Sequence, residues 1–284
     1  MHTLKRQKHS PLYPILKYLS VAMTGVAVTA LVAVLVYVFA DGAGKVSLHF
    51  LFGHSTAVDP TLLPALVGTI WLVLIACGIA LPLGIGCAVF LVEYAGREGR
   101  LVTMIRVAVE TLAGIPSIVY GLFGYLVFVV TLGWGYSVLA GGITLSMMIL
   151  PVVVRSVEES LLAVPASYRE GALALGASKA RTVFTIVLPS AMPGIVTAVI
   201  LAAGRVISES AVLILTIGMT VEKMPADLLC PGTSLALDIY YFAGHGFPDK
   251  AAATSVVLLV FVLALDLLAG AVGRMFTKKT GDLK

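Results

Sequence analysis

Six long apolar segments alternate with short polar stretches along this chain. A helix needs about 20 apolar residues to cross the hydrocarbon core of a bilayer, and each segment is about that long or longer. Within lipid a chain must satisfy its own backbone groups, and uninterrupted apolar runs of this length do so as helices. The pattern therefore predicts an all-α membrane protein with six transmembrane helices at about 19–40, 65–92, 106–130, 137–154, 193–216 and 252–273.

The basic residues between these spans predict the orientation of the chain. If the N-terminus lies in the cytoplasm, most of the 19 Lys and Arg residues fall on the cytoplasmic side. The outer side then holds Lys45, Lys223 and Lys250, and Arg205 falls inside a span. Cytoplasmic loops carry an excess of Lys and Arg, so we expect both termini to be cytoplasmic. The protein is then a multi-pass protein of the inner or plasma membrane.

The composition excludes a soluble protein. Hydrophobic residues make up 59% of the chain and charged residues 12%, whereas a soluble domain carries about a quarter charged residues. The first apolar run follows a basic N-terminus, but it is too long for a cleavable signal peptide and no A-x-A site follows it. The three cysteines, Cys77, Cys87 and Cys230, show no metal or disulfide spacing, and we expect no cofactor and no metal site.

A polar and apolar hairpin is predicted between the fourth and fifth spans. Ser167 and Glu170 have the spacing of a capping box, which predicts a first short helix that begins at Ser167. Gly176 is placed to end that helix as a C-cap. Ser178 can cap a second short helix that runs to about Val187, and Pro189 is expected to end it.

The hairpin resembles the EAA loop of importer-type ABC permeases. In that family the loop seats in a groove of a cytoplasmic ATPase, so the resemblance implies that this chain is driven by a separate motor. One departure is Gly171, where the family has Ala. The chain has no phosphate-binding loop of its own, since the nearest glycine spacing continues Ala-Ser-Lys. The positions that match the family, and that the resemblance assigns to ATPase coupling, are Glu170, Ala172, Gly176, Ile186, Leu188 and Pro189.

Charged residues inside the predicted spans are candidates for function. Arg205 falls near mid-membrane, where an Arg costs at least about 2.5–3.5 kcal/mol on insertion scales. Glu209 is four residues on, on the same face of a continuous helix, and could form a salt bridge that only neutralises Arg205 or could serve transport. Asp266, in the sixth span, could pair with a basic residue of another helix or line a pathway. Arg106 and Glu110 are expected to form a pair at the membrane edge.

A second resemblance indicates a substrate. Residues 204–211, Gly-Arg-Val-Ile-Ser-Glu-Ser-Ala, look like the Gly-Arg-Ala-x-Gly-Glu-Thr-Ala segment of phosphate-specific (Pst-type) ABC permeases. Residues 115–123 resemble the Pro-Ser-Ile-Val-x-Gly-Leu stretch of their A-type subunit, and residues 90–95 also fit. The chain has Ser208 for Gly and Ser210 for Thr, and no Pro follows Ala211. The resemblance covers roughly residues 62–275.

The resemblance implies the type I importer permease fold and a pathway for inorganic phosphate. A guanidinium offers a planar donor fork that suits phosphate oxygens, so Arg205 would contact the anion and Glu209 would keep it from being trapped. Ser208 and Ser210 could add hydroxyl contacts, or could bond their own backbone instead. The implied partners are a dimer of cytoplasmic ATP-binding subunits, a second homologous C-type permease subunit and a phosphate-binding protein.

These inferences divide the chain into four parts. They are a cytoplasmic N-terminal segment (1–18), the first transmembrane helix with an outer loop (19–61), an ABC permease transmembrane domain (62–275) with the coupling hairpin at 165–189, and a cytoplasmic tail (276–284). One alternative is a permease for another oxyanion, such as sulfate, molybdate or phosphonate. Another is an ion-driven secondary transporter or membrane-embedded enzyme. Against that class, the spans hold few carboxylates and no histidine, and no H-E-x-x-H or G-x-S-x-G motif is present.

Overall fold

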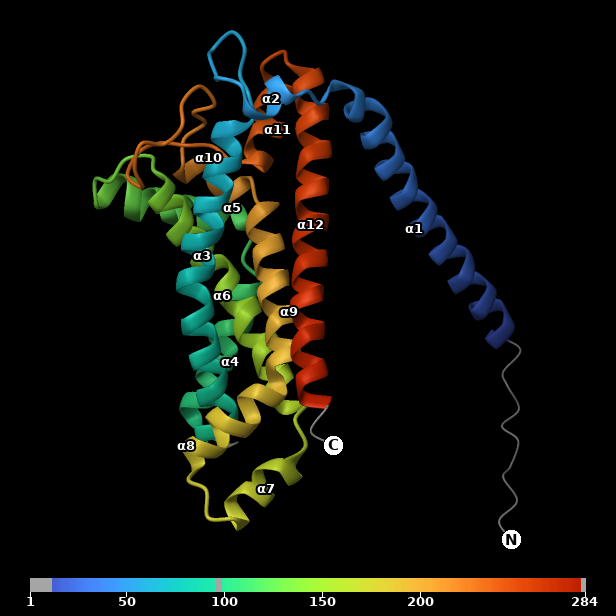
Figure 1. The fold of residues 1–284 in the computed structure, drawn as a ribbon, viewed down its shortest axis with the longest axis vertical. Helices are drawn as coiled ribbons and strands as arrows, with labels where there is room; N and C mark the ends of the chain where they lie inside the picture. The colour runs from blue at the N-terminus through green and yellow to red at the C-terminus, as the bar shows by residue number, and fades with distance from the viewer. Residues whose placement is uncertain (1–11, 96–98, 282–284) are drawn as a thin grey trace.

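The computed structural model describes residues 12–95 and 99–281, which form a helical bundle without strands in those ranges (Figure 1). Its helices are α1 (Leu12–Gly42), α2 (Leu48–Phe52), α3 (Leu63–Val89), α4 (Arg100–Ala113), α5 (Ser117–Gly124), α6 (Val138–Leu162), α7 (Ala166–Ala174), α8 (Lys179–Thr182), α9 (Leu188–Ile207), α10 (Ala211–Thr216), α11 (Leu235–Gly244) and α12 (Pro248–Gly281). A 3₁₀ turn, η1 (Ala43–Lys45), follows α1, and three π-helical segments continue α3, α5 and α8: η2 (Phe90–Tyr94), η3 (Tyr125–Thr131) and η4 (Val183–Val187).

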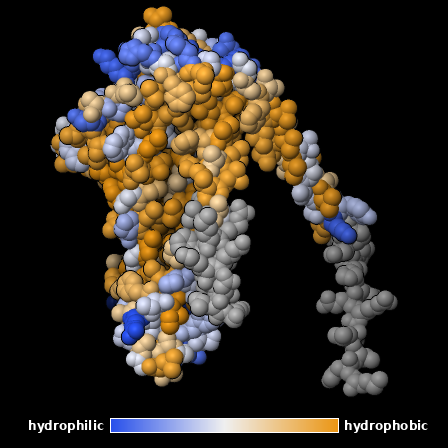
Figure 2. All heavy atoms as spheres, in the orientation of Figure 1, coloured by the Kyte–Doolittle hydropathy of each residue, from blue (hydrophilic) through white to orange (hydrophobic). Residues whose placement is uncertain are grey.

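The predicted all-α membrane fold is confirmed. Within the described residues, five helices are long and apolar enough to cross a membrane, and α4 with α5, bent by 99°, can form a sixth span. Figure 2 shows apolar residues over the length of the bundle, with hydrophilic residues gathered most densely at one end. We call this end, which carries α2, α11 and the loops beside them, the loop end; the opposite end, with α7 and α8, is the hairpin end.

The core of the bundle is built by α3, α6 and α9, which pack against one another. Small residues lie buried on one face of α3: Ala76 and Ala80 have almost no exposed surface. A Cβ at Gly84 would lie 2.6 Å from Cγ1 of Val153, so only glycine permits α3 and α6 to approach this closely. This face of α3 therefore serves helix packing.

Helix α1 stands apart from the bundle along most of its length (Figure 1). It meets α12 near the loop end, where a side chain at Gly42 would collide with Ala252 and Val256. Its apolar side chains, such as Leu31 and Val34, are more than half exposed.

The third predicted span is not one continuous helix, as the sequence suggested, but two helices at a sharp angle. Helix α4 ends at Ala113, and α5 begins at Ser117, directly after Pro116. Proline removes a backbone donor and disfavours helical geometry in the residue before it, which explains the break. Beyond the bend, Gly121 lets α5 contact α10, because a Cβ there would lie 3.0 Å from Cα of Val212.

The fifth span also differs from the prediction. Pro189 does not end the second helix of the hairpin, since α8, η4 and α9 form one run from Lys179 to Ile207. The π-helical segment explains how. The N–H of Leu188 bonds to the carbonyl of Val183, so the backbone hydrogen-bond pattern shifts by one residue just before Pro189, which has no N–H to donate. The predicted span then breaks at 208–210, and α10 follows as a separate short helix.

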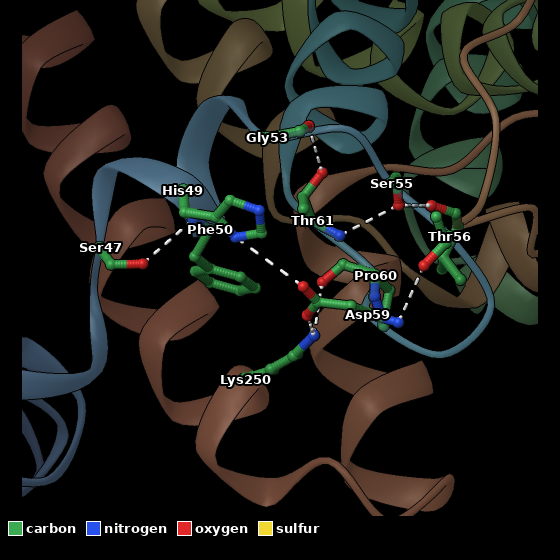
Figure 3. A network of polar contacts seen from close by, with 11 residues as sticks. Ser47, His49, Phe50, Gly53, Ser55, Thr56, Asp59, Pro60, Thr61 and Lys250 are labelled. Carbon is green, nitrogen blue, oxygen red and sulfur yellow. Dashed lines mark hydrogen bonds and ion pairs between the residues drawn. The ribbon is translucent and has the colours of Figure 1, made fainter.

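The loop end is held together by hydrogen bonds between distant segments (Figure 3). Nζ of Lys250, at the start of α12, lies 2.6 Å from Oδ1 of Asp59 and donates to the carbonyl of Pro60. This hydrogen bond with Lys250 lowers the pKa of the exposed Asp59 carboxyl below its usual value. Ser55 donates to the carbonyl of Val221 at 2.7 Å and so joins the loop after α2 to the loop after α10.

Helix α11, at the loop end, contains a buried carboxyl. Asp238 has no exposed surface, and the hydroxyl of Thr233 donates to one of its oxygens. The other oxygen has no hydrogen-bond partner within the described structure. Burial raises the pKa of Asp238 to about 7, even though the Thr233 hydrogen bond acts in the opposite direction.

Candidate functional site

The tip of the hairpin is defined by a glycine with left-handed backbone geometry. Gly176 has φ of +80°, which side chains other than glycine rarely adopt. Its N–H donates to the carbonyl of Leu173 at 3.0 Å, and the N–H of Ala177 donates to the carbonyl of Ala172 at 3.1 Å. These two bonds form a Schellman motif and satisfy carbonyls at the end of α7. The predicted C-cap role of Gly176 is confirmed.

The two predicted N-caps have different outcomes. Ser178 caps α8 as expected, since its hydroxyl accepts from the N–H of Arg181 at 3.3 Å. The capping box of Ser167 and Glu170 is wrong. Helix α7 begins directly after Pro165, so Ser167 already lies inside its first turn and forms no cap bond. The carboxylate of Glu170 is left exposed at the surface of the hairpin.

The residues assigned to ATPase coupling divide between the two sides of the hairpin. Ala172 is buried, and Ile186 and Leu188 are half-buried; of the three, Leu188 packs against the main hydrophobic core of the bundle. Glu170, Gly176 and Pro189 are exposed. Around them lies an apolar surface that the sequence analysis did not identify, which we call the tip patch: Leu173 is 51% exposed, Leu175 90% and Phe184 64%.

Both helices of the hairpin are joined to the end of α3. The guanidinium of Arg169, on α7, lies 2.7 Å from the carboxylate of Glu93 in η2 and also donates to carbonyls at the end of α6. Nζ of Lys179, the first residue of α8, lies 5.4 Å from the centre of the Tyr94 ring. The sequence analysis missed Arg169, because its partner is 76 residues away and no local spacing connects them.

A groove of about 630 Å³ opens beside the hairpin, between α6 and α9. Small and polar residues line much of it, among them Ser156, Ser160, Ser190 and Thr197. Gly194 lies against Ser160, and any side chain at that position would collide with it. Small residues and Ser and Thr side chains are common where membrane helices approach closely.

The intramembrane charges do not form the predicted pair. An i, i+4 salt bridge needs a continuous helix, and α9 ends at Ile207, so Arg205 and Glu209 lie on either side of the break. Oε1 of Glu209 instead accepts from the N–H groups of Ala211 and Val212, at 3.1 and 3.4 Å, and so caps α10. Arg205 is exposed, and its charge lies near enough to Tyr120 for the two to interact electrostatically.

The two serines at the break differ: one hydroxyl donates to the backbone, and the other side chain forms no cap bond. The hydroxyl of Ser208 donates to the carbonyl of Gly204 at 2.9 Å, as serines in membrane helices often do. Ser210 occupies the N-cap position of α10, where its side chain forms no cap bond. Arg205, Glu209 and the two serines therefore all lie at or beside the break between α9 and α10. Among the described residues, no carboxylate forms a salt bridge with Arg205.

Of the other predicted charges, Arg106 has a different partner from the one expected. Arg106 does not pair with Glu110 but with Glu158 of α6, at 2.7 Å. Asp266 is exposed and lines a small apolar groove of about 160 Å³ between α9 and α12, with no basic partner among the described residues. In the described part of the chain, no group of His, Cys, Asp and Glu side chains could hold a metal ion.

Comparisons with known proteins all find membrane components of transport systems. The family described as "Binding-protein-dependent transport system inner membrane component" matches residues 80–280. A Bacillus subtilis (strain 168) protein, "Probable ABC transporter permease protein YqgI", is 35% identical over 283 residues, which cover 92% of this chain and 96% of that protein. "Phosphate transport system permease protein PstA 1" of Mycobacterium tuberculosis (strain ATCC 25618 / H37Rv) is 35% identical over 221 residues, covering 76% and 70%.

Two solved transporters share the fold. A chain of a bacterial alginate ABC transporter, solved in complex with an alginate pentasaccharide-bound periplasmic protein, superposes with a TM-score of 0.69; the match covers 94% of this chain and 98% of that chain, at 17% identity. A chain of the MetNI methionine ABC transporter, in an inward facing conformation, superposes with a TM-score of 0.60 and covers 76% and 94%, at 21% identity. At these identities the likeness establishes the type I importer permease fold and nothing about the substrate.

Proposed function

The chain belongs to the family of inner membrane components of binding-protein-dependent transport systems, and we propose that it is the permease subunit that carries inorganic phosphate into the cytoplasm. The observation that carries the proposal is the identity of 35% to a phosphate transport system permease protein over 76% of this chain. It is supported by the matching charged segment at 204–211.

ATP hydrolysis by a separate pair of subunits would supply the energy. The tip patch supports this, because Leu173, Leu175 and Phe184 expose apolar surface at a place where charged residues also cluster. An exposed apolar surface rimmed by polar residues is typical of a protein interface. We infer that the hairpin inserts its tip patch into a groove of the ATPase, with Glu170 at the rim. In this orientation the hairpin end faces the cytoplasm, the side on which the distribution of Lys and Arg predicts both termini.

The loop end would then face the compartment from which phosphate arrives. A phosphate-binding protein would deliver the anion there, and a second, homologous C-type permease subunit would complete the passage. The compact loop end is compatible with such docking, since Lys250, Asp59 and Ser55 connect its loops into one surface.

The pathway for phosphate is proposed at the break in the fifth span. Arg205 is exposed there and has no carboxylate partner among the described residues, so its guanidinium can donate to an anion. The Glu209 carboxylate is occupied by the start of α10, so it does not neutralise Arg205 directly. A negative charge in the neighbourhood would still weaken anion binding and favour release, which a pathway requires.

Uptake of radiolabelled phosphate tests this assignment. Cells without their own high-affinity phosphate uptake would express the chain with its partner subunits, and unlabelled sulfate, molybdate and phosphonate would compete for uptake. We expect phosphate alone to compete, Arg205→Ala to lose most of the uptake, and Arg205→Lys to retain part of it. Competition by sulfate or molybdate would instead support the oxyanion alternative, and unchanged uptake in Arg205→Ala would remove Arg205 from the pathway.

A further inference from the structure

We propose that Arg169 and Glu93 form a joint through which movement of the hairpin reaches the end of α3. The proposal rests on the proposed function, in which ATP binding moves the hairpin. It assigns to Arg169 the part of a positioning residue: it contacts neither phosphate nor ATP, but connects the helix that is moved to the helices that must respond.

Four hydrogen bonds connect the Arg169 guanidinium to the Glu93 carboxylate and to two backbone carbonyls. Nε and Nη2 donate to Oε1 of Glu93, at 2.9 and 2.7 Å. Nη1 donates to the carbonyl of Val164 at 2.8 Å, and Nη2 also donates to the carbonyl of Leu161 at 2.9 Å. Leu161 lies in the last turn of α6, whose C-terminal end carries a partial negative charge, and Val164 lies in the linker between α6 and α7. One side chain of α7 therefore holds the ends of both α3 and α6.

The joint is buried, unlike an ordinary surface ion pair. The Glu93 side chain is 7% exposed and the Arg169 side chain 22%. By contrast, Arg155 and Glu159 on the outside of α6 are 3.4 Å apart, with side chains 64% and 70% exposed. A buried charge is tolerated when its partner and hydrogen bonds are complete, and removing one partner leaves the other charge uncompensated. The planar fork of Arg suits this arrangement, and Lys cannot make all of its bonds.

The second helix of the hairpin contacts the same short segment. Lys179 of α8 lies over the ring of Tyr94, the residue after Glu93. Both residues belong to η2, where the helix widens to a π-helical turn that ends with the N–H of Ala95 bonded to the carbonyl of Phe90. Such turns are frequent at functional sites. The last turn of α3 is thus held by α7 on one side and α8 on the other.

Little else connects α7 directly to the bundle. Its packing is chiefly against α8 and η4, within the hairpin, and Ala172 is its buried residue. The chain itself joins α7 to α6 through residues 163–165 and continues from α8 through η4 into α9, so a displacement of the hairpin reaches those two helices along the backbone. Helix α3 has no such connection, and its end is joined to α7 through Arg169 and Glu93. Without the joint, the end of α3 would no longer be held to α7.

The test compares Glu93→Gln and Arg169→Lys with a control, Arg155→Gln, which breaks the exposed pair on α6. The complete complex is reconstituted in lipid vesicles, and phosphate uptake and ATP hydrolysis are measured on the same preparation. We expect the two joint variants to keep their ATPase and hydrolyse ATP, but to move at least about fivefold less phosphate per ATP, within the range typical of coupling between sites. The control should keep the wild-type ratio. A wild-type ratio in both joint variants would overturn the proposal.

Hydrogen exchange tests the Arg169–Glu93 joint independently of the proposed substrate. If wild-type vesicles take up no phosphate, the substrate assignment fails, but the joint can still be tested with a non-hydrolysable ATP analogue. In the wild type, the analogue should change exchange in the hairpin and also in residues 85–95. In Glu93→Gln, the change should be confined to the hairpin. An unaltered change in residues 85–95 of that variant would show that the movement travels by another route.

Discussion

Two glycines of the hairpin provide a matched test of its geometry. Gly171 lies within α7, and Gly176 lies just beyond it with φ of +80°. A Cβ added at either position would meet nothing within 4 Å. The substitutions Gly171→Ala and Gly176→Ala therefore differ only in the backbone geometry that the new alanine must adopt, and packing contributes to neither.

The two changes should act in opposite directions. Left-handed geometry costs a residue with a Cβ about 1–2 kcal/mol, so Gly176→Ala should favour opening of the hairpin by about 5- to 30-fold. Alanine in the interior of a helix is favoured over glycine by about 0.5–1 kcal/mol, so Gly171→Ala should close the hairpin further, by about 2- to 5-fold.

Hydrogen exchange of the peptide that covers residues 166–182 measures both effects. The informative amides are those of Gly176 and Ala177, whose N–H groups donate in the Schellman motif. Where local opening limits exchange, the rate follows the opening equilibrium, so it should rise in Gly176→Ala and fall in Gly171→Ala. Equal shifts in the same direction, or an unchanged rate in Gly176→Ala, would refute the assignment of the tip to left-handed glycine geometry. If the hairpin docks on an ATPase, Gly176→Ala should also reduce co-purification of that subunit, and Gly171→Ala should not.

Two further predictions concern the loop end. Gly68→Ala should lower the thermal unfolding midpoint of the purified protein, because its Cβ would collide with the backbone of Thr233, whereas Gly78→Ala on the same helix meets open space and should change it little. The stability of Asp238→Asn relative to the wild type should be greater at pH 8 than at pH 5. The folded pKa of Asp238, about 7, lies above the unfolded value of about 3.9, so the wild type loses stability as pH rises between these values. Equal differences in unfolding midpoint between the two proteins at pH 5 and pH 8 would contradict this.

The spans could be predicted because they depend on local composition. A run of about 20 apolar residues is sufficient to identify a transmembrane helix, and the span predicted at 137–154 needed no knowledge of its neighbours, although the helix continues to Leu162. Gly176 and Ser178 were predicted for the same reason, since a C-cap and an N-cap are properties of a few consecutive residues. Where a neighbouring residue intervened, the local inference failed: Pro165 moved the start of α7 and displaced Ser167 from the cap.

The pairing of charges could not be predicted from spacing. Arg205 and Glu209 are four residues apart, but Ser208 and Ser210 flank a break that turns Glu209 into a cap for α10. A Ser-Glu-Ser sequence before an apolar run was the available signal, because Ser and Glu both favour the start of a helix. The partners of Arg106 and Arg169 lie 52 and 76 residues away, and only the packing of α3, α4, α6 and α7 brings them together.

Phosphate accumulation in lipid vesicles tests the central claim most directly. The chain would be reconstituted with the second permease subunit and the ATPase, with the binding protein and radiolabelled phosphate on the side of the loop end and ATP on the side of the hairpin. The account predicts accumulation that requires ATP and the binding protein and is unaffected when a proton gradient is collapsed. Accumulation driven by a proton gradient without ATP would contradict it and would support a secondary transporter instead.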